Sequence, residues 1–256
     1  KKPKMRKLVA ILLLLATITL PTQAKIQAGI GIKVGPGFGR WNNGAFNAKL
    51  ATAGGTLGYQ TGAHAGMQAR IWFNKFIGLN LAGEFNYTGS TVTRVMGLNT
   101  FKQTHKEGQV SIPLTAMVGW GNERLRFFGN FGGYFGYNVF GQDKQVITLN
   151  GSAQPNDGFV KSDYKNVYNA LDAGVRLGAG IQVYVDKKLK SCVTFDINYD
   201  YGFLKTFKNE VPAYFPSPEK VKITPSRLTI GVGYIYTFGK SQAEEKPKRA
   251  TDLITD

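Results

Sequence analysis

The chain has 256 residues, and its mean hydropathy of −0.18 excludes a membrane protein built from several apolar helices. The formal net charge of +16 is compatible with nucleic acid or with an anionic membrane surface as a partner. Because Cys192 is the single cysteine, an intramolecular disulfide and a cysteine-rich zinc site are also excluded.

The N-terminal segment has the pattern of an export signal. Five basic side chains in residues 1–7 precede an apolar run over 8–20, which Pro21 and the small residues Thr22-Gln23-Ala24 follow. This order predicts a bacterial signal peptide over 1–24, cleaved near Ala24. A bilayer-spanning helix needs about 20 apolar residues, so the run is short for a membrane anchor. Removal of the five basic residues leaves a mature net charge of +11.

Residues 25–239 are dominated by alternation of apolar and polar side chains. In 193–203, for example, Val193, Phe195 and Ile197 alternate with Thr194 and Asp196. Such alternation indicates strands, and runs of about 9–11 residues are the length of a tilted transmembrane strand. The predicted strands are 26–35, 63–73, 76–88, 109–120, 124–138, 170–185, 189–203 and 226–238.

The connections between these segments alternate in length. Short links follow the second, fourth and sixth strands, whereas links of roughly 20 to 30 residues follow the others, as in outer-membrane barrels. We therefore expect an all-β fold, an eight-stranded antiparallel transmembrane up-and-down β-barrel in the outer membrane of a Gram-negative cell. The charged, aperiodic residues 240–256 predict a flexible periplasmic tail. Interfacial aromatics are expected at Phe85, Tyr87, Tyr199, Tyr201, Tyr234, Tyr236 and Phe238.

The same alternation directs a set of charged side chains into the lumen. They are Lys33, Arg70, Glu84, Arg126, Asp172, Arg176, Asp196 and Asp200. The interior of an eight-stranded barrel is just wide enough for side chains to fill it. Unpaired buried charges are costly, so a packed ionic plug is the favoured interpretation, and a narrow polar pathway is the alternative. By parity, Cys192 is a small space-filling residue of the same interior.

Short Gly- and aromatic-rich stretches recur along 26–239: Ile30-Gly31-Ile32-Lys33-Val34-Gly35, Glu84-Phe85-Asn86-Tyr87, Ile112-Pro113-Leu114, Gly132-Gly133-Tyr134, Leu171-Asp172-Ala173-Gly174, Gly178-Ala179-Gly180, Asn198-Tyr199-Asp200-Tyr201-Gly202 and Gly231-Val232-Gly233-Tyr234. In these stretches the chain resembles the PorT-like outer-membrane β-barrel proteins of Bacteroidota. Ser111, where the group usually has an acidic residue, and Gly133, where it often has proline, depart from the pattern. The resemblance implies the barrel and leaves the activity open, since the namesake's role in a protein-export machine is not transferable on fold alone.

Catalytic signals are weak. A Ser-His-carboxylate set of His64, Glu84 and Ser90 is conceivable near the outer rim and would fit an outer-membrane acyl hydrolase or transferase. No Gly-x-Ser-x-Gly stretch surrounds any serine, however. We therefore expect no enzymatic activity, no cofactor and no metal.

The long loops carry much of the excess positive charge, with Arg94, Lys102 and Lys106 in one and Lys205, Lys208, Lys220 and Lys222 in another. Lys and Arg recognise phosphate, so lipopolysaccharide is an expected partner, and envelope proteins are a further one. The signal peptide disfavours nucleic acid. The sequence thus predicts a small outer-membrane barrel with a structural, adhesive or assembly role mediated by long basic extracellular loops, within an export complex or alone.

Overall fold

A computed structural model describes residues 26–42, 48, 50–122, 124–150, 152–153, 159–161, 168–208 and 223–238. The predicted signal peptide over 1–24 and the predicted tail over 240–256 lie outside these residues. Within the described ranges, no helix is long and apolar enough to span a membrane.

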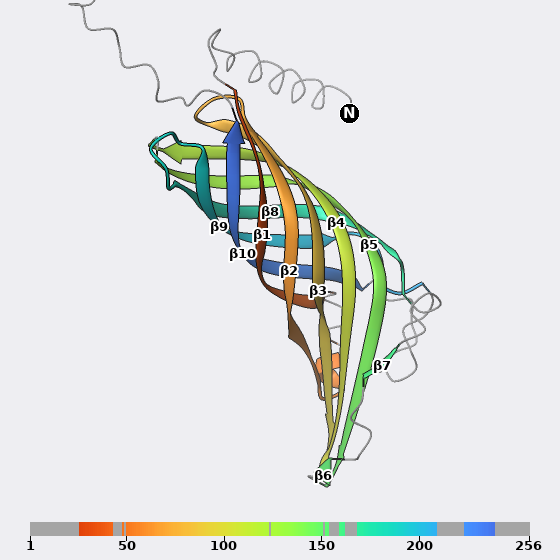
Figure 1. Cartoon of the computed structure of the whole chain (residues 1–256). Coiled ribbons are helices and arrows are strands. Elements are labelled where there is room, and N and C mark those ends of the chain that lie inside the picture. The colour runs from red at the N-terminus through yellow and green to blue at the C-terminus, as the bar shows by residue number, and fades with distance from the viewer. Residues whose placement is uncertain are drawn as a thin grey trace, which may run out of the picture.

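Eight long antiparallel strands close into a ring (Figure 1). In spatial order each strand pairs with the next, from β4 through β3, β2, β1, β10, β9 and β8 to β5, and the pairing of β4 with β5 completes the circle. The strands are β1 (Gln27–Asn42), β2 (Gly55–Trp72), β3 (Ile77–Met96), β4 (Asn99–Gly121), β5 (Leu125–Leu149), β8 (Leu171–Tyr184), β9 (Ser191–Gly202) and β10 (Thr224–Phe238). The predicted fold class is therefore confirmed, because closure leaves no unpaired edge in the barrel wall.

Three tight turns at one end of the barrel share one local device. Asn74, Asn122 and Asp186 each accept two backbone N–H groups with a single side-chain oxygen, at distances of 2.7 to 3.0 Å. Asn and Asp stabilise turns in this way because their short side chains accept hydrogen bonds from backbone N–H groups that have no partner in the strand pairing. Gly121 has φ of 137°, a left-handed conformation that favours glycine. These turns are the three short links that the sequence predicted.

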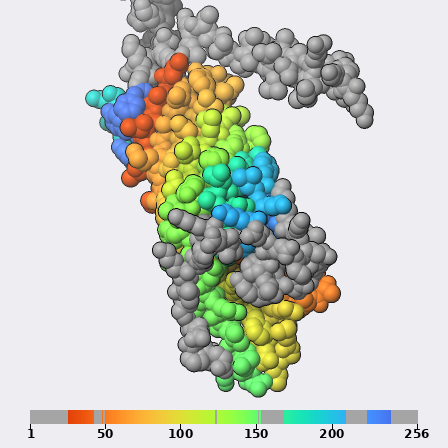
Figure 2. All heavy atoms as spheres, turned by 90° about the vertical axis from the view of Figure 1, so that its right-hand side faces the viewer, coloured from red at the N-terminus to blue at the C-terminus, as the bar shows by residue number. Residues whose placement is uncertain are grey.

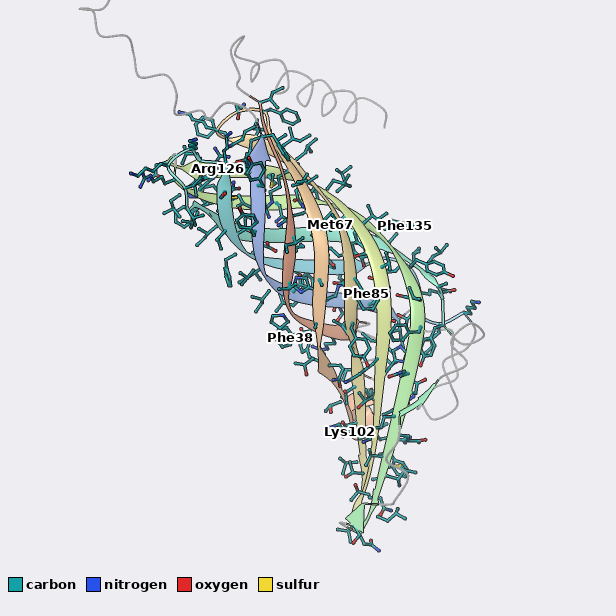
Figure 3. The ribbon with its side chains drawn as sticks, in the orientation of Figure 1. Phe38, Met67, Phe85, Lys102, Arg126 and Phe135 are labelled. Atoms are coloured by element: carbon teal, nitrogen blue, oxygen red, sulfur yellow. The ribbon has the colours of Figure 1, made fainter. Side chains whose placement is uncertain are left out.

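The outer surface of the barrel is an apolar belt bordered by aromatic rings. Ile32, Met67 and Leu177 are 59, 69 and 61% exposed. Large apolar side chains exposed on the outside of a transmembrane barrel contact lipid. Met67, Phe85 and Phe135 all project outward from the wall (Figure 3). Aromatic pairs stand at both borders: Tyr201–Phe203 and Tyr87–Phe140 at one, and Trp120–Phe127 and Tyr236–Phe238 at the other.

The strands differ from the prediction at the end opposite the tight turns. β3, β4 and β5 have 20, 23 and 25 residues, whereas 13, 12 and 15 were predicted, and they run far past the barrel as a narrow projection (Figures 1 and 2). We call this projection the extension: residues 55–62 of β2, 88–96 of β3, 99–108 of β4 and 140–149 of β5. The long loop expected between 88 and 109 is thus almost entirely β-sheet, and the described parts of the loops expected over 36–62 and 139–169 also contain strand residues. Their alternation was hidden because polar residues occupy both faces once the strands leave the lipid.

A small hydrophobic core lies at the base of the extension, where Trp41 at the outer end of β1 contacts His105 of β4. It comprises Trp41, Leu50, Val92, Tyr168, Phe207 and Ile223, each at most 9% exposed, and only Val92 of these belongs to the extended strands. Two short strands, β6 (Ser152–Ala153) and β7 (Phe159–Lys161), pair with the outer part of β5. Backbone pairing joins β2, β3, β4 and β5 along the extension, and this core packs against its base, so the extension is a defined structural element rather than a set of independent loops.

Candidate functional site

The eight charged side chains predicted for the lumen all lie inside the barrel, and none is more than 7% exposed. They come from β1, β2, β3, β5, β8 and β9, because the inward positions of these strands alternate with the lipid-facing ones. Six of them form one ion-pair network, which Arg227 of β10 joins. Arg126 and Asp172 lie outside it.

The centre of the network is the guanidinium of Arg176. Its Nη1 and Nη2 donate to the two carboxylate oxygens of Glu84 at 2.6 and 2.8 Å, and its Nε and Nη2 donate to Asp200 at 2.6 and 2.8 Å. Lys33 Nζ lies 2.6 Å from Glu84, and Arg227 Nη2 lies 2.7 Å from Asp200. Paired, bidentate contacts of this kind fix geometry as well as charge, so two carboxylates and three cations cross-link opposite walls of the barrel.

The remaining lumen charges are arranged around this centre. Asp196 lies 3.9 Å from Lys33 and 3.7 Å from Arg70. Arg70 and Arg126, nearer the turns, stack over the rings of Phe128 and Trp72 at 4.6 and 4.4 Å. Cation–π contacts are favourable where the cation is desolvated, as in this interior.

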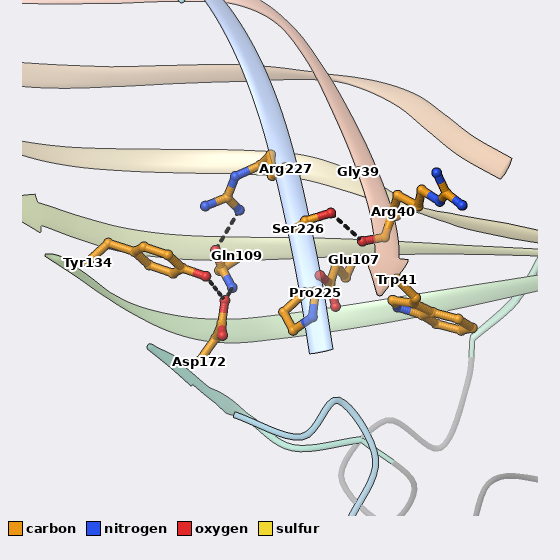
Figure 4. Close-up of a pocket in the computed structure, with 11 residues that line it drawn as sticks. Gly39, Arg40, Trp41, Glu107, Gln109, Tyr134, Asp172, Pro225, Ser226 and Arg227 are labelled. Atoms are coloured by element: carbon orange, nitrogen blue, oxygen red, sulfur yellow. Dashed lines mark hydrogen bonds between the residues drawn. The ribbon is translucent and has the colours of Figure 1, made fainter. Parts of the chain in front are cut away.

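At the other end of the network, Asp172 accepts hydrogen bonds from Tyr134 Oη at 2.8 Å and from Gln109 Nε2 at 3.1 Å. Gln109 in turn accepts one from Arg227 Nη1 at 2.6 Å (Figure 4). These side chains and Trp41 line a polar cavity of about 10 Å³. Such a volume holds about one water molecule, and Gln109 and Asp172 around it are 1 and 3% exposed.

The structure does not bring together His64, Glu84 and Ser90, the Ser-His-carboxylate set considered from the sequence. His64 Nδ1 lies 3.3 Å from the carbonyl oxygen of Pro36, and the strand register places His64 opposite Asn86. Ser90 lies opposite His105 instead, and its hydroxyl accepts the backbone N–H of Trp41 at 3.2 Å. The carboxylate of Glu84 forms ion pairs with Lys33 and Arg176.

In the sequence, His105 falls in the long link between the predicted strands 76–88 and 109–120, where a solvated loop residue is the simplest expectation; the structure shows this expectation to be wrong. It is completely buried in the extension, where its ring stacks on Tyr168 at 4.3 Å and contacts Trp41 at 5.4 Å. Burial by itself lowers the pKa of His105, but the 2.7 Å hydrogen bond to Asp143, together with nearby Glu107, outweighs burial and raises this pKa to about 9. The imidazole is therefore protonated at neutral pH.

Sequence reasoning also missed Arg227 and Gln109. Arg227 lies within the predicted strand 226–238 and has the inward parity of Thr229, so the parity argument applied to the start of that strand would have found it. Gln109 was passed over because it is uncharged. Among the described residues, no group of three His, Cys, Asp or Glu side chains could hold a metal ion.

Comparison with known proteins identifies the barrel type. The model of the family described as "Outer membrane protein beta-barrel domain" matches residues 21–208. No curated protein matches the chain. Matching solved structures include the outer membrane protein OprG from Pseudomonas aeruginosa, with 14% identity over 85% of this chain and 97% of that one and a TM-score of 0.43. Ail, the attachment invasion locus protein of Yersinia pestis, is 13% identical over 82% of this chain and 99% of that one, with a TM-score of 0.36.

Proposed function

Because the chain belongs to the outer membrane protein beta-barrel domain family, we propose that its barrel is a non-enzymatic anchor and that its extension makes the functional contact. One observation carries this proposal: β3, β4 and β5 continue well beyond the length of β8, β9 and β10, which have 14, 12 and 15 residues and suffice to span. The additional length, against whose base a small hydrophobic core packs, is not needed to cross the membrane.

The interior of the barrel supports the same division of labour. The ion pairs around Arg176 join β3, β8 and β9, and the cavity beyond them has room for about one water. A conduit for solutes requires a continuous open path, which these paired side chains obstruct. A narrow pore is therefore the less supported function.

The outer face of the extension carries a lysine patch next to the membrane border. Lys102 and Lys106 of β4 and Lys144 of β5 share this face, since Lys144 pairs with Thr104, which lies between the two. Lys102 lies in the part of the extension that projects beyond the barrel (Figure 3). Lys106 Nζ stands 5.5 Å from the ring centroid of Tyr87, a residue of the aromatic border. Lysines immediately outside an aromatic girdle lie at the level of lipid headgroups.

We infer that the partner of this patch is the phosphorylated headgroup region of lipopolysaccharide. Lysine binds phosphate as a point charge, and anionic headgroups attract basic segments by roughly 1 kcal/mol for each cation near the surface. An envelope protein, including a component of an export complex of the kind that kinship with PorT-like proteins would imply, is the alternative occupant of the same face.

Site-specific photo-crosslinking in outer-membrane vesicles tests the proposal, since these vesicles keep lipopolysaccharide in the outer leaflet. A benzophenone amino acid at Thr104, between the lysines, should yield a lipopolysaccharide adduct visible as a mass shift. The combined substitution Lys102→Gln, Lys106→Gln and Lys144→Gln should remove most of this adduct. The same probe at Lys188, in the exposed turn between β8 and β9, is the matched control and should give none.

Different products separate the partners. An adduct of protein mass at Thr104 would favour the envelope-protein alternative, whereas no adduct, or an equal one at Lys188, would overturn the proposed contact. Unboiled and boiled samples of each variant should migrate differently on a denaturing gel, which shows that the barrel is folded.

A further inference from the structure

A second cavity lies in the extension, away from the lumen network. It has a volume of about 200 Å³, and its apolar wall comprises Leu50, Val92, Met96 and Phe101. Leu50 and Val92 belong to the hydrophobic core at the base of the extension and are 1 and 9% exposed, whereas Met96 is 43% exposed. The cavity therefore runs from the edge of that core toward the solvent.

One cation faces this apolar wall, because the strand register pairs Arg94 with Phe101. Arg94 Nε donates to the carbonyl oxygen of Ala53 at 3.3 Å, which holds the guanidinium beside the cavity. Lys102 also borders the cavity, but its side chain has the parity of the outer-face lysine patch, and the other polar residues of the lining are glutamines. No carboxylate of the described residues forms an ion pair with Arg94 or Lys102, in contrast to the arginines of the lumen network.

We propose that this cavity binds the apolar chain of a small anionic amphiphile, whose carboxylate or phosphate is held by Arg94. A mostly apolar pocket with a few fixed polar groups is the usual form of a small-molecule site. A cavity of about 150 Å³ lined by apolar side chains can bind benzene, so this larger one accommodates a hydrocarbon chain of moderate length. The charge of Arg94 selects an anionic head over a neutral one. The inference is independent of the proposed lipopolysaccharide contact.

Methyl NMR of the full chain in phosphatidylcholine nanodiscs provides the test, with octanoate as the probe because it is soluble in water. Titration should shift the methyl resonances of Val92 and Leu50 along a saturating curve. Arg94→Gln should weaken the affinity about tenfold, as expected for the loss of a hydrogen bond to a charged group. Met96→Trp fills the cavity from its exposed end and should abolish the shifts while the barrel remains folded by the gel assay.

Two further ligands, octanol and octyl phosphate, test which head group the cavity recognises. Octanol, the neutral analogue, should bind the wild-type chain as weakly as octanoate binds the Arg94→Gln variant. Octyl phosphate distinguishes a phosphate source from a carboxylate source, and saturable binding of either anion supports the site. Shifts confined to lipid-facing methyls such as those of Leu81 and Leu114, equal binding of octanol and octanoate, or unchanged affinity in Arg94→Gln would each refute the proposal.

Discussion

The ionic network of the lumen should depend most strongly on Arg176. The substitution Arg176→Met removes four charge-assisted hydrogen bonds of 2.6 to 2.8 Å and leaves Glu84 and Asp200 to Lys33 and Arg227. Breaking a buried ion pair from one side costs about 3–5 kcal/mol, because the remaining charge stays buried. Since each carboxylate keeps one cation, we expect a loss of about 3 kcal/mol in the free energy of unfolding.

Urea unfolding in phospholipid vesicles, followed by tryptophan fluorescence, measures this loss. Arg126→Met is the matched control: Arg126 is also buried, at 7% exposed against 2% for Arg176, yet it contacts the ring of Trp72 rather than a carboxylate of the described residues. We expect it to cost about 1–2 kcal/mol, the range of a desolvated cation–π contact. The double variant Glu84→Gln with Arg176→Met should lose less than the sum of the single losses, because it leaves fewer buried charges unpaired.

The reasoning would be refuted if Arg176→Met cost less than Arg126→Met. It would equally fail if the free-energy changes of Glu84→Gln and Arg176→Met were additive, since residues in one network are expected to couple.

Three further predictions concern the fold, the extension and the interior. Gly62→Ala should destabilise the barrel, because a Cβ would collide with the carbonyl oxygen of Tyr87, whereas Gly83→Ala, where a Cβ meets open space, should leave the urea midpoint unchanged. The pKa of His105 rises from 6.5 to about 9, so its contribution to stability, about 3 kcal/mol, is fully present below pH 6.5 and is lost as the pH rises through 9. Hydrogen exchange of the extension should therefore separate His105→Asn from the wild-type chain more at pH 6 than at pH 10, where only the lost ring contacts with Tyr168 and Trp41 remain; equal differences at both would contradict this. Cys192 is fully buried, so maleimide should label it only in urea, and rapid labelling of the folded barrel would place it elsewhere.

The barrel was predictable because the lipid imposes a simple rule on its sequence. Wherever a strand crosses the membrane, one face must be apolar and the other polar or small, and this alternation identified eight strands and their three tight turns. The inward direction of the charged side chains follows from the same parity, as Lys33 and Asp196 illustrate.

The extension escaped prediction because no such rule acts outside the lipid. Thr91, Thr93 and Gln103 lie in strand segments that carry polar residues on both faces. The sequence there shows no alternation of apolar and polar residues from which a strand could be predicted. The burial of His105 depends on Trp41 and Tyr168, residues distant in the chain that only the tertiary structure brings to its ring. Parity likewise shows which charged side chains point into the lumen but not which of them lie close enough to form ion pairs.

The central claim is that the barrel is closed and serves as an anchor, so that function resides in the extension. Conductance of the purified full chain in planar lipid bilayers tests this claim most directly. The ion pairs of Arg176 with Glu84 and Asp200, and the water-sized cavity beyond them, predict a silent bilayer. A steady, reproducible conductance at neutral pH would contradict the claim and move the function into the lumen.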